Sequence, residues 1–485
     1  MSEIYFPRED SYLLEKYVSL FAEKSVLEIG IGSGIQSFTA AVKKEVTFVI
    51  GIDINQKAVN HSTKLAKQKV HKNVLFLQSN LFKNLYEKNF SYDKKKNEIV
   101  ITKKVVTKEI TDKNKKKNQK IDNHKVWKYG SKTNNQENHT FHTIILNPPY
   151  LPEDGFKKDI ALIGGKHGYE IIEQFLNEVN TFLHTNGRIL LLFSSKTGKE
   201  KVDTFIENNL LEYTLLEEKY IGGFETLFVY DIKKTDILKE LERKGLQDIH
   251  KFSKGHRGDI FIADWKNRHK KSKNSANKNN EKDSVAKVII KKQRANIQIE
   301  TIRNEITVLK KVNKKRIGPK LFFADDNSKE PFFVCEYING IKIEEFLEKK
   351  SKKEIQKVLK NIFEQCFILD TMQLTKEEMH RPYKHIIVKE KVSKDTFMKE
   401  KNTKLKKNKQ TKEHLPILLD FERCRYDSDP KNVTQFCQYV TSQRIRTLLE
   451  RKKFTIDIEK IRKTAKEYKE NKDISSLLKS VGIDE

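Results

Sequence analysis

The chain has 485 residues, too many for one ordinary hydrophobic core, so two or more domains are expected. Its basic residues exceed its acidic ones, 96 to 67, for a net charge of +29. Its four cysteines form no C-x-x-C pair, which argues against a disulfide scaffold or a cysteine zinc site and is typical of a reduced cytosolic protein. The N-terminus lacks a secretory signal pattern, and no apolar run approaches the roughly 20 residues needed to cross a bilayer, so a soluble, cytoplasmic protein is expected.

Three lysine-rich stretches carry most of the positive charge. Residues 88–140 have a net charge of +9, residues 266–282 of +6 and residues 389–412 of +7. They are rich in lysine, asparagine and glutamine and show little apolar periodicity, which indicates solvated insertions in loops. Binding of nucleic acid through these insertions is the alternative that the charge leaves open.

A glycine-rich turn follows the first apolar run of the chain. The segment SVLEIGIGSGIQS (25–37) predicts a buried strand that turns at Gly30, Gly32 and Gly34 into a helix, whose first amides would face a ligand. Glu28 lies just before the glycines, and a carboxylate there suits a cofactor with a cationic end. The ammonium group of S-adenosylmethionine is such an end.

The next two apolar runs place polar groups at strand ends. VTFVIGIDIN (46–55) predicts a strand that ends at Asp53, where an acid can accept hydrogen bonds from both ribose hydroxyls of a nucleoside. VLFLQSNLF (74–82) predicts a third strand with Asn80 and Leu81 at its end. The glycine turn together with the acid favours nucleoside binding over a simple turn.

Strands and helices alternate through the rest of the first half. HTIIL (142–146) and RILLLFSS (188–195) predict buried strands, and 168–187 has the apolar spacing of a helix that stops at Gly187. This alternation predicts a doubly wound α/β domain.

The segment NPPYLP begins where a predicted core strand ends. Two prolines cannot extend a strand because neither donates a backbone hydrogen bond. The Asn147 side-chain oxygen and the Pro148 carbonyl could hold the N–H groups of an amide or aromatic amine and aim its lone pair at a methyl group. The prolines would fix that geometry before the substrate arrives, and Tyr150 could stack on a planar substrate group. These residues predict the catalytic site of an N-methyltransferase.

At these residues the chain resembles the HemK family of protein-glutamine methyltransferases, most of all its archaeal and eukaryotic branch. The resemblance covers about 1–235 and is carried by PREDSYLL, LEIGIGSG, IDIN, SNLF, NPPYLP, DIALIGGKHGYEIIEQFL and LLLFSSKTG. It implies contacts to cofactor or substrate from Ser11, Glu28, Gly30, Asp53, Asn80, Leu81 and Asn147. Asn80 stands where the family usually has aspartate, and the 88–140 insertion replaces a short link.

The resemblance implies a substrate and a partner. The substrate would be the glutamine of the Gly-Gly-Gln motif in a peptide-chain release factor, and members of that branch commonly work with a small zinc-binding activator subunit. NPPY is shared with adenine-N6 nucleic-acid methyltransferases, which are the alternative. The PREDSYLL and SSKTG flanks favour the protein-modifying enzyme.

The second half predicts the outline of a kinase. KFSKGHRGDIFIADW (251–265) suggests a glycine loop with Gly255 and Gly258 between two strands. Lys291 at a strand end and Glu305 on the next predicted helix are placed to pair, with the lysine on nucleotide phosphates.

Two further segments complete this outline. FFVCEYING (332–340) resembles a kinase hinge and contains Glu336, and ILLDFE (417–422) resembles the Asp-Phe-Gly turn, with Asp420 as the magnesium ligand. Glu378 or His380 stands where the catalytic aspartate of a kinase would be, and His385 replaces the metal-binding asparagine.

The second half resembles an archaeal family of RIO-related, kinase-like proteins, which implies ATP and magnesium as ligands. Whether the unit transfers phosphate or is a binding module without chemistry is left open by the missing aspartate. The sequence thus predicts a Rossmann-like S-adenosylmethionine-dependent methyltransferase domain over 1–235, followed by an α+β protein-kinase-like domain over 236–485.

Overall fold

The computed structural model describes residues 4–103, 140–153, 163–254, 258–266, 285–294, 301–392 and 412–483. The chain forms two compact units, Met1–Leu246 and Gln247–Glu485. The expected boundary at residue 235 stays a prediction. Helix α6 (Asp236–Arg243) follows that residue and lies in the first unit, where Lys234 Nζ contacts Glu242 Oε1 at 2.7 Å.

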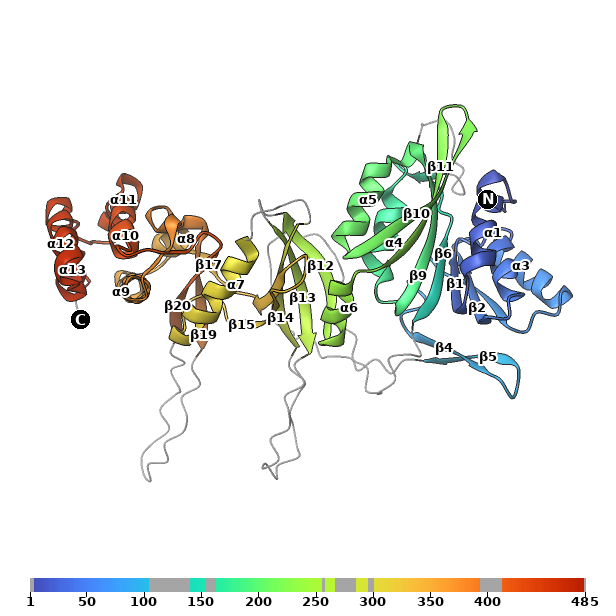
Figure 1. Ribbon diagram of the computed structural model, residues 1–485, viewed down its shortest axis with the longest axis horizontal. Coiled ribbons are helices and arrows are strands. Elements are labelled where there is room, and N and C mark those ends of the chain that lie inside the picture. The colour runs from blue at the N-terminus through green and yellow to red at the C-terminus, as the bar shows by residue number, and fades with distance from the viewer. Residues whose placement is uncertain are drawn as a thin grey trace, which may run out of the picture. The chain divides into compact units, whose positions relative to one another are not determined.

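The first unit is built on a seven-stranded sheet, and most of its strands are labelled in Figure 1. Its strands in spatial order are β10 (Leu211–Gly222), β11 (Glu225–Lys234), β9 (Leu183–Ser194), β6 (Phe141–Leu146), β1 (Lys24–Ile29), β2 (Val46–Asp53) and β3 (Val74–Gln78). The five strands from β9 to β3 are parallel. Strand β11 is antiparallel to both of its neighbours, β9 and β10, so β10 runs in the same direction as the five. The predicted α/β class is confirmed.

Helices cover both faces of this sheet. The helices are α1 (Glu9–Phe21), α2 (Ile35–Ala41), α3 (Gln56–Gln68), α4 (Glu170–Val179) and α5 (Lys199–Asn208). Figure 1 shows α4 and α5 on one face and α1 with α3 on the other. Strands covered on both faces are continuously apolar, and β1 accordingly buries every residue after its first.

The segment 168–187 differs from its prediction as one long helix. Helix α4 ends at Val179, and β9 begins at Leu183, which pairs with Phe141 of β6. A Cβ on Gly187 would lie 2.9 Å from the Phe141 carbonyl oxygen, so this glycine permits close strand packing rather than stopping a helix. Pairing with β6 outweighs the helical spacing of the apolar residues.

The start of the 88–140 insertion also differs from the expectation of an unstructured solvated loop. Residues Lys88–Asp93 (β4) and Glu98–Lys103 (β5) form an antiparallel hairpin. Phe90 of β4 is buried, with its ring centroid 6.0 Å from that of Phe141. Residues 104–139 lie outside the described part of the chain.

The second unit begins with a five-stranded sheet in the order β12 (Leu246–Lys254), β13 (Gly258–Lys266), β14 (Val285–Gln293), β16 (Phe332–Glu336), β15 (Leu321–Asp325). One helix, α7 (Thr301–Val312), follows β14. A second, mostly helical part contains α8 (Ile343–Lys349), α9 (Lys352–Thr371), α10 (Asn432–Thr441), α11 (Gln443–Arg451), α12 (Ile458–Asn471) and α13 (Ile474–Ser480).

Between α9 and α10 run short strands and 3₁₀ turns. They are β18 (Leu374–Thr375), η4 (Glu377–His380), η5 (Pro382–Lys384), β19 (Ile386–Val392), β20 (Lys412–Leu418) and β21 (Arg425–Tyr426). Strand β19 pairs with β20 and with β17 (Ile341–Lys342), and β18 pairs with β21. This order of elements supports the predicted kinase-like class.

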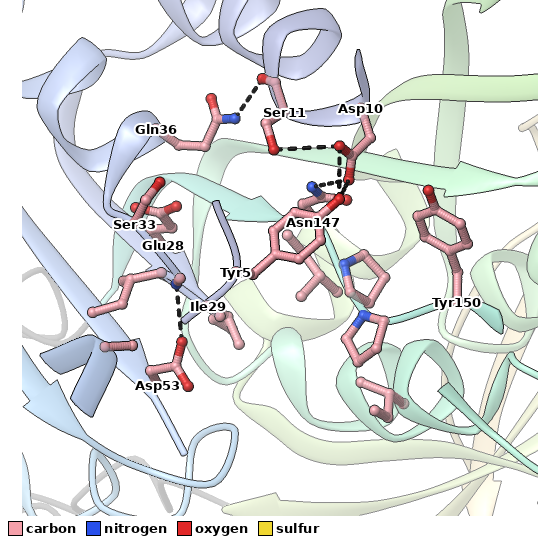
Figure 2. A pocket seen from close by; sticks show the side chains of 18 of the residues that line it. Tyr5, Asp10, Ser11, Glu28, Ile29, Ser33, Gln36, Asp53, Asn147 and Tyr150 are labelled. Carbon is pink, nitrogen blue, oxygen red and sulfur yellow. Dashed lines mark hydrogen bonds between the residues drawn. The ribbon is translucent and has the colours of Figure 1, made fainter. Parts of the chain in front are cut away.

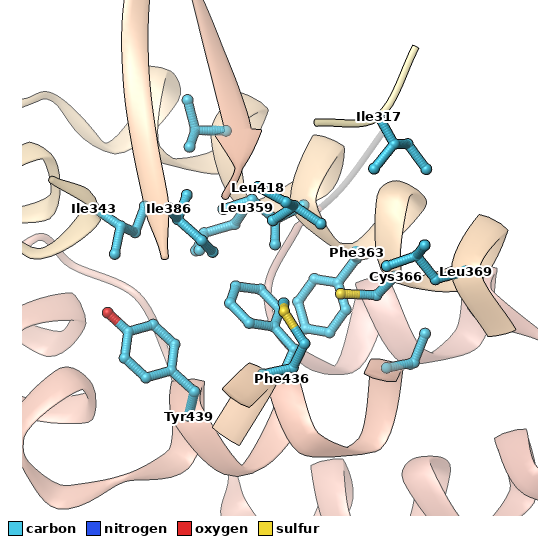
Figure 3. Close-up of a cluster of buried hydrophobic side chains, with 14 of the residues drawn as sticks. Ile317, Ile343, Leu359, Phe363, Cys366, Leu369, Ile386, Leu418, Phe436 and Tyr439 are labelled. Atoms are coloured by element: carbon cyan, nitrogen blue, oxygen red, sulfur yellow. The ribbon is translucent and has the colours of Figure 1, made fainter. Parts of the chain in front are cut away.

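A large apolar cluster holds the helical part together, and Figure 3 shows its centre. Phe363 of α9 and Phe436 of α10 meet edge to face, with ring centroids 4.8 Å apart. All four cysteines of the chain are buried. No helix in the described part of the chain is both long and apolar enough to cross a membrane.

Candidate functional site

A cavity of about 590 Å³ opens at the carboxyl ends of the parallel strands of the first unit. In open α/β sheets this edge is where ligands bind, and the volume lies in the usual range for small-molecule sites. The cavity is lined by the glycine turn after β1, the end of β2, the segment after β3, the Asn-Pro-Pro-Tyr segment after β6 and the start of α1. Sequence segments far apart in the chain therefore meet at one site.

The glycine turn and Asp53 are joined directly. The Gly32 amide donates to Asp53 Oδ2 at 3.0 Å, and the Asn55 amide donates to Asp53 Oδ1 at 2.8 Å. Gly30 and Gly32 have φ values of +77° and +49°, which residues with a Cβ rarely adopt. Burial raises the pKa of Asp53. Its carboxylate is thus held in place at the end of β2, as a ribose acceptor must be.

Gly34 is the residue at which the glycine turn enters helix α2, and it does not line the cavity. It caps α2 with a φ of +85°, and a Cβ there would meet the Phe38 ring and Ser62 Oγ at 2.9 Å. Its predicted contact with the cofactor therefore does not follow from the structure.

Glu28 is a buried acid in the cavity wall, with 3% of its surface exposed. Its Oε2 accepts hydrogen bonds from the backbone amide of Ser37, at 2.8 Å, and from Ser37 Oγ. Burial raises its pKa to about 8 although the Ser37 hydrogen bonds oppose the shift. No cation contacts Glu28 among the described residues, so no opposite charge offsets the unfavourable burial of its ionised form. A cationic ligand group beside Glu28 would stabilise that ionised form.

Asn147 and Pro148 lie where β6 ends. Asn147 Nδ2 donates to Asp10 Oδ2 at 2.9 Å, while Asn147 Oδ1 is buried and has no hydrogen-bond partner among the described residues. Tyr150 lines the same cavity, and burial together with the Asp10 carboxylate raises its pKa, so its phenol stays neutral. Asn147 and Tyr150 thus both line the cavity, and Asn147 carries a buried acceptor that has no partner among the described residues.

The remaining predicted cofactor residues also line the cavity. Asn80 is exposed after β3, and Leu81 has a φ of +45°, a strained backbone for a leucine. Ser11 donates through Oγ to Asp10 Oδ1 at 3.3 Å. The structure brings all of these residues together, and their ligand contacts stay predictions.

In the second unit, Lys291 lies at the centre of a charged cluster. Its Nζ contacts Glu305 Oε2 at 2.6 Å, Asp420 Oδ1 at 3.2 Å and Glu422 Oε2 at 3.3 Å. The predicted pairing of Lys291 with Glu305 is therefore present. The acid oxygens of the three carboxylates lie within 4.8 Å of one another, an arrangement that could hold a metal ion.

Lys376 links this cluster to the loop after β18. The side chain of Lys376 is fully buried, and its Nζ donates to the backbone oxygen of Asp420. Glu378 Oε2 lies 3.6 Å from the same Nζ, and His385 Nδ1 lies 3.7 Å from Asp420 Oδ2. His380 is exposed, and its Nδ1 lies 3.1 Å from a backbone oxygen.

The other residues predicted to bind the nucleotide are Glu336, Gly258 and Gly255, and among the described residues no hydrogen bond or ion pair joins Glu336 or Gly258 to the Lys291 cluster. Glu336 ends β16, and its Oε1 pairs with Lys389 Nζ at 2.8 Å. Gly258 begins β13, where a Cβ would lie 2.8 Å from the Lys292 carbonyl oxygen. Gly255 lies outside the described residues, so the predicted glycine loop stays a prediction.

Comparison with known proteins identifies the first unit. A family model described as "Methyltransferase domain" matches residues 20–296, more than half of the chain. A curated "Putative protein N5-glutamine methyltransferase" of Methanocaldococcus jannaschii is 30% identical over 207 residues, which cover 41% of this chain and 76% of the relative. The chain belongs to this methyltransferase family. The resemblance to the HemK family is thereby confirmed, and membership implies S-adenosylmethionine as the methyl donor.

Two further matches concern a second glutamine methyltransferase and the second unit of the chain. A "Release factor glutamine methyltransferase" of Fusobacterium nucleatum is 39% identical over 98 residues, which are 19% of this chain and 27% of the relative. A family model described as "Protein tyrosine and serine/threonine kinase" matches residues 246–376. The methyltransferase is therefore fused to a kinase-like domain.

Solved structures with similar parts are more distant. The Mtq2–Trm112 complex of E. cuniculi is 20% identical, with a TM-score of 0.30, and covers 48% of this chain and 98% of that one. WbdD, solved with a kinase inhibitor, is 13% identical, with a TM-score of 0.42, and covers 99% of this chain and 93% of that one.

Several residues of the methyltransferase site were missed from the sequence. Asp10 and Tyr5 contact one another beside Asn147, as Figure 2 shows, and Gln36 donates to the Ser11 carbonyl oxygen at 2.8 Å. Asp10 belongs to the PREDSYLL segment, in which the family resemblance points to Ser11 alone. In the kinase-like unit, Lys376 lies outside the predicted motif positions, and Glu422 stands at the glycine position of the Asp-Phe-Gly turn, where the motif predicts no charged side chain.

Proposed function

We propose that the methyltransferase unit methylates the side-chain amide nitrogen of a glutamine, within the Gly-Gly-Gln motif of a peptide-chain release factor. The two curated relatives bear names of protein-glutamine and release-factor-glutamine methyltransferases. The observation that carries the proposal for this chain is the buried, unpaired Oδ1 of Asn147 at the cavity wall.

A primary amide suits this wall because its nitrogen has two N–H groups and a delocalised lone pair. Asn147 Oδ1 would accept one N–H, and the carbonyl of Pro148 the other. Holding both hydrogens leaves the nitrogen facing the methyl group, and positioning of this kind supplies much of the rate of a transfer reaction. Tyr150 would cover the plane of the amide.

The residues present fit the cofactor. Asp53 is fixed at the end of β2 as a ribose acceptor, and Glu28 is a buried acid suited to the ammonium group. Gln36 Oε1 is a second buried acceptor without a partner among the described residues. When bound, the cofactor would supply an electrophilic methyl group on a positively charged sulfur.

The test is transfer of a labelled methyl group to a release factor with and without its Gly-Gly-Gln glutamine, beside an adenine-containing oligonucleotide. Any small zinc-binding activator from the same source should be included, because the family resemblance implies one. Label that depends on the glutamine would support the proposal. Label on the oligonucleotide would replace it with the adenine-N6 reaction and would make the lysine-rich insertions relevant to substrate binding.

For the second unit we propose binding of ATP with magnesium. Lys291 paired with Glu305 and Asp420 supports this, since such a lysine can contact nucleotide phosphates and such an aspartate can ligate magnesium. ATP consumption that disappears in Asp420→Ala would show a catalytic unit. Nucleotide binding that needs no magnesium and gives no turnover would show a binding module.

A further inference from the structure

Asp10 is a buried acid at the start of α1, with 4% of its surface exposed. Three neutral donors converge on its carboxylate, as Figure 2 shows: Asn147 Nδ2 at 2.9 Å, the Tyr5 hydroxyl at 3.0 Å from each oxygen, and Ser11 Oγ at 3.3 Å. The first turn of a helix also stabilises a negative charge. The carboxylate oxygens of Asp10 therefore accept hydrogen bonds from fixed directions.

A carboxylate at this position determines which way the Asn147 amide faces. The two ends of an asparagine side chain have nearly the same shape, but one end donates and the other accepts. An ionised aspartate only accepts, so it can hold only the Nδ2 end of Asn147. The Oδ1 end must then point away from Asp10, where it is buried and unpaired among the described residues.

The unpaired oxygen indicates a place prepared for a donor. Leaving a buried carbonyl oxygen without a hydrogen-bond partner destabilises the folded state. If the amide turned over, Nδ2 would face the substrate nitrogen, and two donors would oppose each other. The hydrogen bond from Asn147 Nδ2 to the Asp10 carboxylate, a class worth about twice a neutral one, opposes that turn and keeps Oδ1 on the side away from Asp10.

We propose that Asp10 is a positioning residue of the methyl transfer. It fixes the Asn147 amide so that the cavity offers an acceptor to the N–H of the substrate nitrogen, and Tyr5 and Ser11 hold Asp10 itself. The inference rests on the proposed function as far as the acceptor is a nitrogen that carries hydrogen. It also predicts rejection of a glutamate in place of the glutamine, because a carboxylate has no N–H to donate.

The test is a double-mutant cycle in the full-length chain with Asp10→Ala, Asn147→Ala and both together. Asp10→Ala is expected to lower kcat about 10- to 100-fold, as a small misplacement of a catalytic group does. The dissociation constant for S-adenosylmethionine should stay within about threefold, because the contacts of Asp53 are untouched. When Asn147→Ala is already present, adding Asp10→Ala should lower kcat by less than about threefold.

Tyr12→Ala is the matched control, because Tyr12 lies on the same helix with 59% of its surface exposed and does not line the cavity. Its kcat should equal that of the wild type. Losses for Asp10→Ala and Asn147→Ala that multiply would overturn the proposal, as would an unchanged kcat in Asp10→Ala.

A second variant guards against misfolding. Asp10→Asn keeps the volume but replaces one acceptor with a donor, so it should give a smaller loss of kcat than Asp10→Ala. If Asp10→Ala fails to bind S-adenosylmethionine and Asp10→Asn works at the wild-type rate, Asp10 has only a structural role.

Failure of the proposed function would look different. A wild-type chain that methylates another nitrogen instead of glutamine would refute the substrate and leave the same cycle to be measured on that nitrogen. Coupling between Asp10 and Asn147 would then still support the positioning role, and independence would still exclude it.

Discussion

The buried acid Glu28 makes cofactor binding depend on pH. With a pKa of about 8, Glu28 is ionised in about one molecule in ten at pH 7 and in about one in a hundred at pH 6. The ammonium group of S-adenosylmethionine binds best to the ionised form, and an α-amino group stays protonated below about pH 7.7. Between pH 7 and pH 6 the affinity should therefore weaken about tenfold, or about 1.4 kcal/mol.

Calorimetric titration with S-adenosylmethionine in buffers of different ionisation enthalpy measures the affinity and the number of protons released on binding. At pH 7 the wild type should release about 0.7 proton on binding, which is about 0.9 from Glu28 less about 0.2 taken up by the α-amino group. Glu28→Gln cannot ionise, so its affinity should not change between pH 6 and pH 7, and it should release no proton. A wild-type affinity that is the same at both pH values, without proton release, would refute the assignment of Glu28 to the ammonium group.

The raised pKa of Glu28 also makes the stability of the chain without cofactor depend on pH. The folded chain keeps the Glu28 proton up to about pH 8, whereas the unfolded chain loses it near 4.5, the ordinary pKa of a glutamate. The folded state therefore binds more protons in this window, and stability falls as pH rises through it. Glu28→Gln should remove that fall, so its melting temperature at pH 9 should exceed that of the wild type.

Three further changes test the two units separately. Asp53→Ala should weaken binding of S-adenosylmethionine at least about tenfold by calorimetry, since it removes the acceptor of the Gly32 amide and of the ribose; an unchanged affinity would count against the ribose role. Lys291→Met should destabilise the kinase-like unit by about 3–5 kcal/mol in denaturant, because Glu305 is left buried without a cation, while a Lys291→Met/Glu305→Leu pair should recover most of that loss. Phe436→Ala should cost about 3–5 kcal/mol, and a loss near zero would mean that the apolar cluster closes over the gap.

The cavity could be located from the sequence because parallel strands end at one edge. β1, β2 and β6 were recognised as apolar runs, so Glu28, Asp53 and Asn147 had to meet where those strands end. This reasoning needs only the strand pattern and the right-handed connections of the fold. It is independent of the contacts that side chains make afterwards.

Contacts made by residues outside the strands could not be found in this way. Asp10 and Asn147 are 137 residues apart, and Asp10 starts a helix whose placement on the sheet no local pattern specifies. The helix expected over 168–187 is present but ends early, at Val179, for a related reason. Pairing between Leu183 and Phe141 is a long-range contact, and it outweighs the local apolar spacing.

The three carboxylates around Lys291 limit what can bind to the kinase-like unit. A nucleotide phosphate that drew Lys291 away would remove the cation that Glu305, Asp420 and Glu422 share, and the oxygens of these carboxylates lie within 4.8 Å of one another. Whatever displaces the lysine must therefore bring positive charge of its own, as a nucleotide complexed with a divalent cation does. Such a unit would respond to the concentration of the metal complex and not to that of total nucleotide, so depletion of the cation would empty it even in excess nucleotide.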